Sequence, residues 1–453
     1  MKNETIVAVS TPVGVGAISI VRLSGDQSLS IAKKLFSSTG FDYEKIEARK
    51  LYLGNFSFNN ISDQCLMVYF KAPYSYTGED LVEFQIHGST KLTSVVVSAV
   101  CSSGARLASE GEFTKRAFIN GKITLDKAEG VIDTINAQSE NELRAANELV
   151  HGRLFQFVLS LQNNLKDLIS RLEVSLDYPE HDIEYLEKEY AKQRIEEYMI
   201  ELNKLIENSD ENQFIKNGVN VAIVGKVNVG KSSLLNALLG ENRAIVTDIE
   251  GTTRDIIKET ITHKGLKINF IDTAGIRQSS DIVEKIGIEK SYQQIESSDI
   301  VLFVFDSSRK LENDEIETLE KILNKPHIII ANKTDSAVYE ENFKLDILKN
   351  EKVFKISALL NKNVDLVKDE IVKLSDCEKI DFSEICLTNA RHINSVKIAK
   401  EYLNSAKESC ENFTIDIISF ELKKAWNELG KITGETENED IIDAIFSKFC
   451  LGK

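Results

Sequence analysis

A glycine-rich loop that ends in lysine and serine lies near the middle of the chain. Residues 225–232 read Gly-Lys-Val-Asn-Val-Gly-Lys-Ser; they follow an apolar run at 219–224 and open into an apolar, helix-like run at 233–238. Strand, glycine loop and helix form the context that a phosphate-binding loop requires. Backbone N–H groups can surround the phosphates, Lys231 can reach the outer ones, and the Ser232 hydroxyl can ligate magnesium at the helix N-terminus. The loop therefore predicts a site for a nucleoside triphosphate.

Two polar motifs downstream have the positions of the switch segments of a GTPase. Residues 272–275, Asp-Thr-Ala-Gly, directly follow the apolar run 268–271. The aspartate can therefore lie behind the magnesium, and the glycine N–H can meet the γ-phosphate. Upstream, residues 251–255, Gly-Thr-Thr-Arg-Asp, form a polar loop that can place a threonine hydroxyl on the metal. Ordinary polar loops between strands would explain each motif alone. They do not explain why the motifs follow the phosphate-binding loop in the order that a GTPase needs.

Two further motifs indicate which base is bound. Residues 332–335, Asn-Lys-Thr-Asp, follow the strand-like run 328–331, and the Asp335 carboxylate can accept hydrogen bonds from the ring N–H and the exocyclic amine of guanine. Adenine has no such pair of donors, so this motif selects GTP over ATP. Residues 357–359, Ser-Ala-Leu, follow a short run at 353–356 and would lie behind the base. Five motifs in this order predict a GTPase.

One position of the usual catalytic set is different. Ras-like enzymes carry glutamine after the glycine of the Asp-x-x-Gly motif to orient the attacking water, whereas this chain has Ile276. Glu284 is our candidate for polarising the water, and the alternative is an exposed acidic residue in a chain that has 71 of them. Asn228 could help to hold a monovalent cation between the phosphates, in place of an arginine finger. Its alternative is a loop residue that tolerates turn conformations.

Composition limits the classes of partner. The chain has 453 residues, enough for two to four domains with sizeable cores. Its formal net charge is -16, so general electrostatic binding to nucleic acid is not expected, and an RNA contact must be local or supplied by a partner. No run approaches the ~18 apolar residues of a membrane span and no signal peptide is visible, so we expect a cytoplasmic protein without a membrane partner. The six cysteines lack C-x-x-C spacing, which favours reduced thiols.

The expected fold is multidomain α/β plus α. Residues 1–118 alternate strand-like and helical runs and form an N-terminal α+β domain; residues 217–375 form a Ras-like P-loop G domain inserted between helical segments at 119–216 and 376–453. One discontinuous helical domain is the preferred interpretation, and two separate small bundles are the alternative. Strands are expected at 5–9, 17–23, 65–71 and 81–87, and a helix at 92–101.

Two helical faces are visible in the pattern. The first marks a long bundle or coiled-coil helix that Pro179 ends, and its residues are Leu154, Val158, Leu161, Leu165, Leu168 and Leu172. The second lies near the C-terminus, and its residues are Ile441, Ile442, Ala444, Ile445, Phe446 and Phe449. Directly after it, a thiol, a glycine and a basic residue end the printed sequence. Cys450 alone is no more than a small buried or frayed thiol.

The chain resembles the MnmE (TrmE) family of tRNA-modification GTPases over essentially its whole length. Outside the nucleotide motifs, the resemblance lies in residues 11–25, 76–80, 111–118 and 431–435, and in the ending 446–453 with its Cys-x-Gly-Lys signature. Other GTPases share the central domain but lack both ends.

The resemblance implies a homodimer formed through a folate-binding N-terminal domain, with the G domain inserted in a helical domain. It implies a potassium-activated GTPase that binds GTP, magnesium and potassium and works with the flavoprotein MnmG, which carries FAD, in a heterotetramer. Together they would add an aminomethyl or carboxymethylaminomethyl group to carbon 5 of the wobble uridine of certain tRNAs. A tetrahydrofolate derivative, 5-formyl or methylene, would supply the one-carbon unit, and glycine or ammonium the amine.

The resemblance also implies roles for single residues. The GTP-binding positions are Asn228, Val229, Gly230, Lys231, Ser232, Ser233, Thr247, Thr252, Thr253, Asp272, Thr273, Ala274, Gly275, Asn332, Lys333, Asp335, Ser357 and Ala358. The magnesium ligands are Ser232 and Thr253, and the potassium site is Asn228, Thr247, Ile249 and Thr252. Glu284 matches the water-orienting acid. The folate-binding positions are Arg22, Glu83, Lys122 and Lys453. Cys450 could act on uracil carbon 6 or line the folate pocket.

A rival interpretation is a ribosome-assembly switch GTPase without group-transfer chemistry. Its G domain would look much the same. The acidic balance, the lack of an appended basic RNA-binding module and the first 120 residues or so argue against it.

Overall fold

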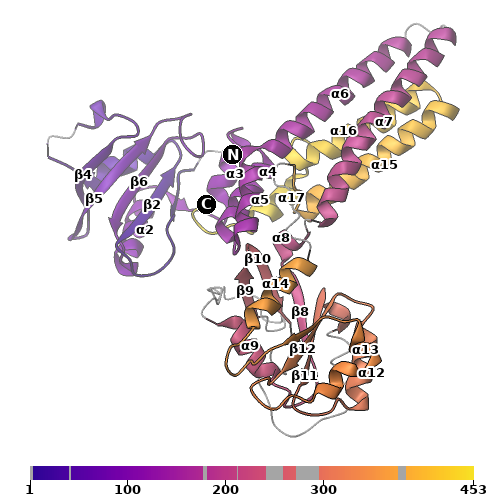
Figure 1. The fold of residues 1–453 in the computed structure, drawn as a ribbon. Coiled ribbons are helices and arrows are strands. Elements are labelled where there is room, and N and C mark those ends of the chain that lie inside the picture. Colours follow the sequence, from indigo (N-terminus) through magenta and orange to yellow (C-terminus); the bar gives the residue numbers. More distant parts are fainter. Residues whose placement is uncertain are drawn as a thin grey trace. The chain divides into compact units, whose positions relative to one another are not determined.

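The computed structural model describes residues 4–39, 42–176, 181–211, 213–240, 259–271, 295–375 and 384–453. Figure 1 shows its helices and strands. The chain divides into two compact units, each built from separated stretches. The first contains residues 1–132, 149–184 and 413–453, and the second contains residues 133–148 and 185–412.

The first unit contains a seven-stranded sheet in the order β3-β4-β5-β6-β2-β1-β7. Its strands are β1 (Ile6–Val9), β2 (Ile18–Ser24), β3 (Phe36–Ser37), β4 (Leu51–Phe58), β5 (Ile61–Phe70), β6 (Leu81–His87) and β7 (Arg106–Leu107). Alternate residues of β2 and β6, such as Leu23 and Phe84, are buried with helices α1 (Ser28–Leu35) and α2 (Thr90–Ser102) in one core. The α+β expectation for this part of the chain is confirmed in outline.

The sequence reading missed strand β4. Its Leu51 and Leu53 side chains are 54% and 58% exposed, so its apolar residues do not mark a core face. Gly54 lies against the Phe36 ring, where an added Cβ would come within 2.4 Å of a ring carbon. A glycine in a strand-like run weakens the strand signal, although here it is what permits the close approach.

Further helices of the first unit come from both sides of the predicted G domain in sequence. They are α3 (Glu112–Ile119), α4 (Leu125–Asn136, which continues past this unit), α6 (Arg153–Leu176), α16 (Ile415–Thr433) and α17 (Glu439–Phe446). All six apolar positions predicted for the α6 face are buried. Gln162 donates to the Trp426 carbonyl at 3.2 Å and Lys423 pairs with Glu173, so α6 and α16 lie side by side. The predicted break at Pro179 lies outside the described residues.

The C-terminal segment packs back onto the beginning of the chain. Phe446 and Phe449 of this segment share a small core with Leu125 of α4. An added Cβ at Gly111 would meet the Phe446 carbonyl oxygen at 2.3 Å. Gly452 has φ +91° and lies so close to the end of β1 that a Cβ would come within 2.1 Å of the Val9 carbonyl oxygen.

The second unit contains a six-stranded sheet in the order β13-β12-β11-β8-β10-β9. Its strands are β8 (Val219–Val224), β9 (Glu259–His263), β10 (Leu266–Phe270), β11 (Ile300–Asp306), β12 (His327–Asn332) and β13 (Val353–Lys355). All neighbours are parallel except the β9–β10 hairpin. The central strands β11 and β12 are nearly continuous apolar runs because apolar cores cover both faces of the sheet, as is usual for parallel sheets.

Helices complete the second unit. Those of the G-domain region are α8 (Gln213–Asn217), α9 (Lys231–Leu239), α12 (Asn313–Ile322), α13 (Asp346–Lys349) and α14 (Val364–Leu374); α5 (Glu140–His151), α7 (His181–Glu211) and α15 (Ala390–Asn412) lie outside it in sequence. Lys192 of α7 pairs with Glu411 of α15 at 2.7 Å. Here too, helices from before and after the G-domain sequence associate, which favours the interrupted helical arrangement over two separate bundles.

The described residues contain neither a membrane-spanning helix nor a disulfide bond. Within the ranges given above, no helix combines the length and apolar character needed to cross a bilayer. No disulfide bond joins the described cysteines, which are Cys65, Cys101, Cys386, Cys410 and Cys450.

Candidate functional site

The phosphate-binding loop connects β8 to α9, as its flanks predict. Gly225 and Gly230 both have positive φ, +152° and +98°. A Cβ at Gly225 would come within 2.1 Å of the Val304 carbonyl oxygen, and one at Gly230 within 2.3 Å of the Asn332 amide nitrogen. The backbone conformation and the lack of space each require glycine at both positions. The loop thus forms a backbone cradle of the kind that receives phosphate.

Lys231 lies in the first turn of α9 and turns back over the loop. Its ammonium donates hydrogen bonds to the Gly225 and Lys226 carbonyl oxygens, each at 2.6 Å. Burial lowers the pKa of Lys231. Charge-assisted hydrogen bonds to an anion are stronger than bonds to neutral carbonyls. Triphosphate oxygens would therefore be better partners for this half-buried ammonium than the two carbonyls. Ser232 follows in the same first turn, where its hydroxyl suits a magnesium ligand.

Asn228 is a non-glycine residue of this loop that has a positive φ. Its φ is +66°, in the left-handed region that asparagine enters more easily than most residues. This conformation agrees with the alternative interpretation of Asn228 as a turn residue. Its side-chain amide oxygen is also chemically suited to bind potassium. Lys226, two residues earlier, pairs with Glu312 at 2.6 Å and Asp314 at 2.8 Å and so ties the loop to the start of α12.

The predicted base-recognition motif begins at the last residue of β12 and contacts the phosphate-binding loop directly. The Asn332 side chain donates to the Val229 carbonyl at 2.9 Å and accepts from the Ala358 N–H at 3.0 Å. The Ser357 hydroxyl donates to the Asp335 carboxylate. One asparagine therefore holds together three motifs that the sequence analysis identified separately, and Ser357 orients the carboxylate expected to read guanine.

Lys333 of the same motif is fixed by a residue that the sequence analysis did not single out. Its φ is +65°, and its ammonium pairs with Asp306, the last residue of β11, at 2.6 Å. Burial would raise the pKa of Asp306, but the bonds from Lys333 and Ser308 lower it below its ordinary value. An aspartate at the end of a buried strand beside the base-recognition strand was the available signal, because the carboxyl ends of neighbouring parallel strands meet at one edge.

Much of the predicted nucleotide site lies outside the described residues. Those predictions concern Thr247, Ile249, Thr252, Thr253, Asp272, Thr273, Ala274, Gly275, Ile276 and Glu284. The magnesium and potassium ligand sets thus each contribute one described residue, Ser232 and Asn228.

The first unit brings together two of the predicted folate-binding residues. Arg22 on β2 and Glu83 on β6 are directly opposite in the antiparallel register, and their side chains form an ion pair at 2.8 Å. Their side chains are only 18% and 13% exposed. The Arg22 guanidinium also lies over the rings of Tyr76 and Phe113, at 5.6 and 5.8 Å from the ring centres. A basic group, a carboxylate and two rings are suitable chemistry for an acidic ligand with a flat ring system.

The other predicted residues of that site are placed separately. Lys122 donates to the Pro73 carbonyl at 2.9 Å and lies against Gly78, in the loop that also carries Tyr76. Lys453 follows Gly452, which packs on the end of β1, the strand next to β2. Cys450 is exposed, one turn before. The aromatic partners of Arg22 were not predicted, although both lie in segments that carry the family resemblance.

The fold and the loop geometry of the second unit define a P-loop GTPase domain. Comparison with known proteins places the rest of the chain. Residues 5–122 match the family model described as GTP-binding protein TrmE N-terminus, and residues 125–450 match the one described as MnmE helical domain.

Full-length relatives agree with the family models. The tRNA modification GTPase MnmE of Clostridioides difficile (strain 630) is 40% identical over 456 residues, covering 100% of this chain and 99% of that protein. The tRNA modification GTPase MnmE of Aquifex aeolicus (strain VF5) is 40% identical over 455 residues and 100% of both. The chain therefore belongs to the MnmE family of tRNA modification GTPases. Among solved structures, a variant of Aquifex aeolicus Era bound to GDP and AlF4- is 29% identical over 41% of this chain and 66% of that chain, with a TM-score of 0.27.

Proposed function

We propose that this GTPase uses potassium and magnesium and acts with the flavoprotein MnmG to modify carbon 5 of the wobble uridine of certain tRNAs. The product would carry an aminomethyl or carboxymethylaminomethyl group, with the one-carbon unit taken from a 5-formyl or methylene tetrahydrofolate. The working form would be a cytoplasmic homodimer in a heterotetramer with its partner. The proposed domains are 1–118, 119–216, 217–375 and 376–453.

The observation that carries this proposal is the Arg22–Glu83 ion pair, together with the position of the Arg22 guanidinium over the rings of Tyr76 and Phe113. The function of a switch GTPase without group-transfer chemistry does not require a largely buried charged pair and two aromatic rings in a separate α+β domain. Arginine suits the glutamate tail of folate, and a carboxylate can accept from the amino group and ring N–H of a pterin. Lys122 and Lys453 would add positive charge for the tail.

In the G domain, the described residues suit the proposed roles. Lys231 and the cradle made by Gly225 and Gly230 would hold the phosphates, and Ser232 would ligate magnesium. Asn228 would offer its amide oxygen to potassium, a cation that can stabilise charge developing between the phosphates as an arginine finger does. Glu284 would orient the attacking water in place of the missing glutamine. Nucleotide-driven changes of the G domain would then gate the modification chemistry.

Mass spectrometry of nucleosides from total tRNA, with and without the gene, tests the proposal. Loss of 5-substituted wobble uridines that the intact gene restores is the expected result. A Cys450→Ser gene separates two roles for the thiol, because normal modification by this variant would exclude attack on uracil carbon 6. Unchanged nucleosides in a strain with no second copy would contradict the modification role.

The ribosome-assembly interpretation is less favoured, since the full-length relatives are named tRNA modification GTPases. A melting-temperature shift with 5-formyltetrahydrofolate separates the two, because a switch GTPase without folate chemistry should not respond.

A further inference from the structure

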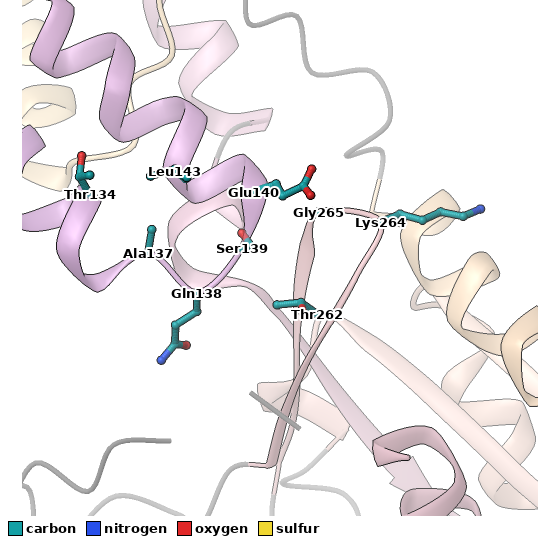
Figure 2. A pocket seen from close by; sticks show the side chains of 9 residues that line it. All are labelled: Thr134, Ala137, Gln138, Ser139, Glu140, Leu143, Thr262, Lys264 and Gly265. Carbon is teal, nitrogen blue, oxygen red and sulfur yellow. The ribbon is translucent and has the colours of Figure 1, made fainter. Parts of the chain in front are cut away.

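The tip of the β9–β10 hairpin contacts a short helical segment that lies far from it in sequence. This segment, residues 133–148, belongs to the same compact unit as the G domain, whereas the residues before it and after it belong to the other unit. Figure 2 shows the turn between α4 and α5 facing the hairpin, with Gln138 and Ser139 on the helical side and Thr262 and Gly265 on the hairpin side.

One ion pair crosses this contact. Glu142 on α5 and Lys267 on β10 lie with Oε1 and Nζ 3.6 Å apart, and their side chains are 10% and 20% exposed. The other Glu142 oxygen accepts from the Gln138 N–H. Oε1 has no hydrogen-bond partner among the described residues. A buried carboxylate oxygen without a hydrogen bond is costly, so Lys267 is the group that compensates this charge.

The backbone of the tip is fitted to the same segment. Gly265 has φ +78°, and an added Cβ would come within 3.0 Å of the Asn141 side-chain oxygen. Beside the contact is an open cavity of about 570 Å³, lined by Thr134, Ala137, Gln138, Leu143, Thr262 and Lys264 among others. The ion pair is longer than a hydrogen bond and the space next to it is not filled, so the hairpin tip has room to shift against α5.

The hairpin itself is firmly part of the G domain. His263 and Lys264 both pair with Asp369 of α14, at 2.7 and 3.0 Å. Strand β10 pairs in parallel with β8, and β8 leads directly into the phosphate-binding loop. In sequence, β9 follows the motif at 251–255 and β10 ends just before the one at 272–275. A displacement caused by nucleotide would therefore reach the tip through strands that are directly bonded to the site.

We propose that the contact of Lys267 and Gly265 with α5 is the point at which the nucleotide state of the G domain is passed to residues 133–148. The distance between Glu142 and Lys267 changes with the bound nucleotide, because the cavity leaves the hairpin tip room to move. The segment of α4 and α5 that contacts the tip then changes its position or its stability. This inference deepens the proposed function, in which nucleotide state governs modification, and it identifies Glu142 and Lys267 as positioning residues rather than catalytic ones.

Hydrogen–deuterium exchange of the full-length protein, with GDP and with a non-hydrolysable GTP analogue, tests the inference. Glu142→Gln keeps an acceptor for Gln138, and Lys267→Met keeps most of the side-chain volume, so both remove the charge pair with little change of shape. Lys352→Met is the matched control, because it removes a Lys–Glu pair within the G domain, to Glu370, away from α5. Nucleotide affinity and the rate of GTP hydrolysis are measured on each variant.

For the wild type and Lys352→Met, we expect the two nucleotides to give amide exchange rates over 137–143 that differ by about fivefold or more, the lower end of usual allosteric couplings. For Glu142→Gln, Lys267→Met and the double variant, we expect about twofold or less, with GTP binding retained. A wild-type difference that persists in both charge variants would overturn the inference, as would its absence from the wild type while GTP binds. Failure of the proposed function would be separate, because it would leave tRNA nucleosides unchanged whatever the exchange data show.

Discussion

The Asn332 side chain donates a hydrogen bond to the Val229 carbonyl at 2.9 Å, so the base-recognition motif and the phosphate-binding loop are bonded to each other directly. The same amide nitrogen lies where a Cβ at Gly230 would come within 2.3 Å. The geometry of one loop therefore depends on the other.

Gly230→Ala should weaken GTP binding at least about tenfold. The methyl group would push Asn332 away from Val229, and alanine would also be strained at φ +98° by about 1–2 kcal/mol. Gly240→Ala is the control, since its φ is +42° but the nearest atom to the new Cβ is 3.7 Å away. Isothermal titration with GDP and GTP measures the effect. Similar losses in both variants would mean that strain alone, and not the Asn332 contact, is responsible.

Asn228→Gly should separate the potassium role from the turn role. Glycine adopts the φ of +66° without strain, so the loop keeps its shape and loses only the amide. We expect GTP affinity to change less than about threefold and potassium stimulation of kcat to fall by about a hundredfold, as when other charge-stabilising groups are removed. Titrations of hydrolysis with potassium and with sodium provide the measurement. A glycine variant that still responds to potassium as the wild type does would leave Asn228 as a turn residue.

Asp335→Asn should change the preferred base from guanine to xanthine. The amide presents a donor where guanine also presents donors, whereas xanthine has a carbonyl at that edge. An unpaired polar group in the site costs about 1–3 kcal/mol, so GTP affinity should fall at least about fivefold and XTP affinity should rise. Ser357→Ala, which removes the hydroxyl bonded to Asp335, should weaken GTP only a few-fold. Competition between the two nucleotides decides the case, and loss of both would indicate a damaged loop.

Lys122→Ala should weaken binding of 5-formyltetrahydrofolate by up to about fivefold, as expected for one exposed charge–charge contact. Lys122 is exposed and bonds only a carbonyl among its described contacts, so the melting temperature without ligand should stay the same. Lys115→Ala, which breaks a surface pair with Asp443, serves as the control. Fluorescence titration reports the affinities, and an equal effect of the two variants would argue against a specific role for Lys122.

Glu112 should give the first unit a measurable pH dependence of stability. Burial would raise its pKa, but hydrogen bonds from Arg106, the Ser109 N–H and Arg116 outweigh this and lower it from 4.5 to about 2. Since the folded-state pKa is the lower one, the stabilisation is complete above about pH 4.5 and is lost as the pH falls toward 2.

Melting curves of wild type and Glu112→Gln should therefore differ by a constant amount near neutral pH, and this difference should shrink steadily as the pH falls below about 4.5 toward 2. The exposed neighbour Glu110 provides the control, because Glu110→Gln should follow the wild type throughout. A difference for Glu112→Gln that stays constant down to pH 3 would show that the carboxylate charge is not what stabilises this corner.

Local pattern predicted much of the G domain. The predicted strand 219–224 coincides with β8, because a parallel strand buried on both faces is a mostly apolar run, interrupted here by Asn220. The order of the motifs predicted that the loops would meet. It did not predict how they meet, since the bond from Asn332 to Val229 and the pair of Lys333 with Asp306 depend on neighbouring strands that the sequence separates widely.

The strands and contacts of the N-terminal domain were harder to predict from sequence, for a related reason. The antiparallel strand β4 exposes its leucines and uses Gly54 to accept a ring from β3, so its pattern resembles a loop. Arg22 and Glu83 were assigned by family resemblance, and only the register of β2 with β6 gives them a physical relationship. The contacts of Tyr76 and Phe113 with Arg22 could be found only in the tertiary fold, because neither residue lies next to Arg22 in sequence.

The contact of Gly452 with the end of β1 has a consequence for how the protein is made. The Ser10 hydroxyl and the Gly452 carbonyl that it bonds are 442 residues apart. At ribosomal speeds of about 5–20 residues per second, roughly 20 to 90 s pass between their syntheses. The segment around Ser10 thus waits through translation of the whole G domain before Gly452 can reach it. Nascent chains that have not yet reached residue 452 should therefore hold the N-terminal domain without this contact.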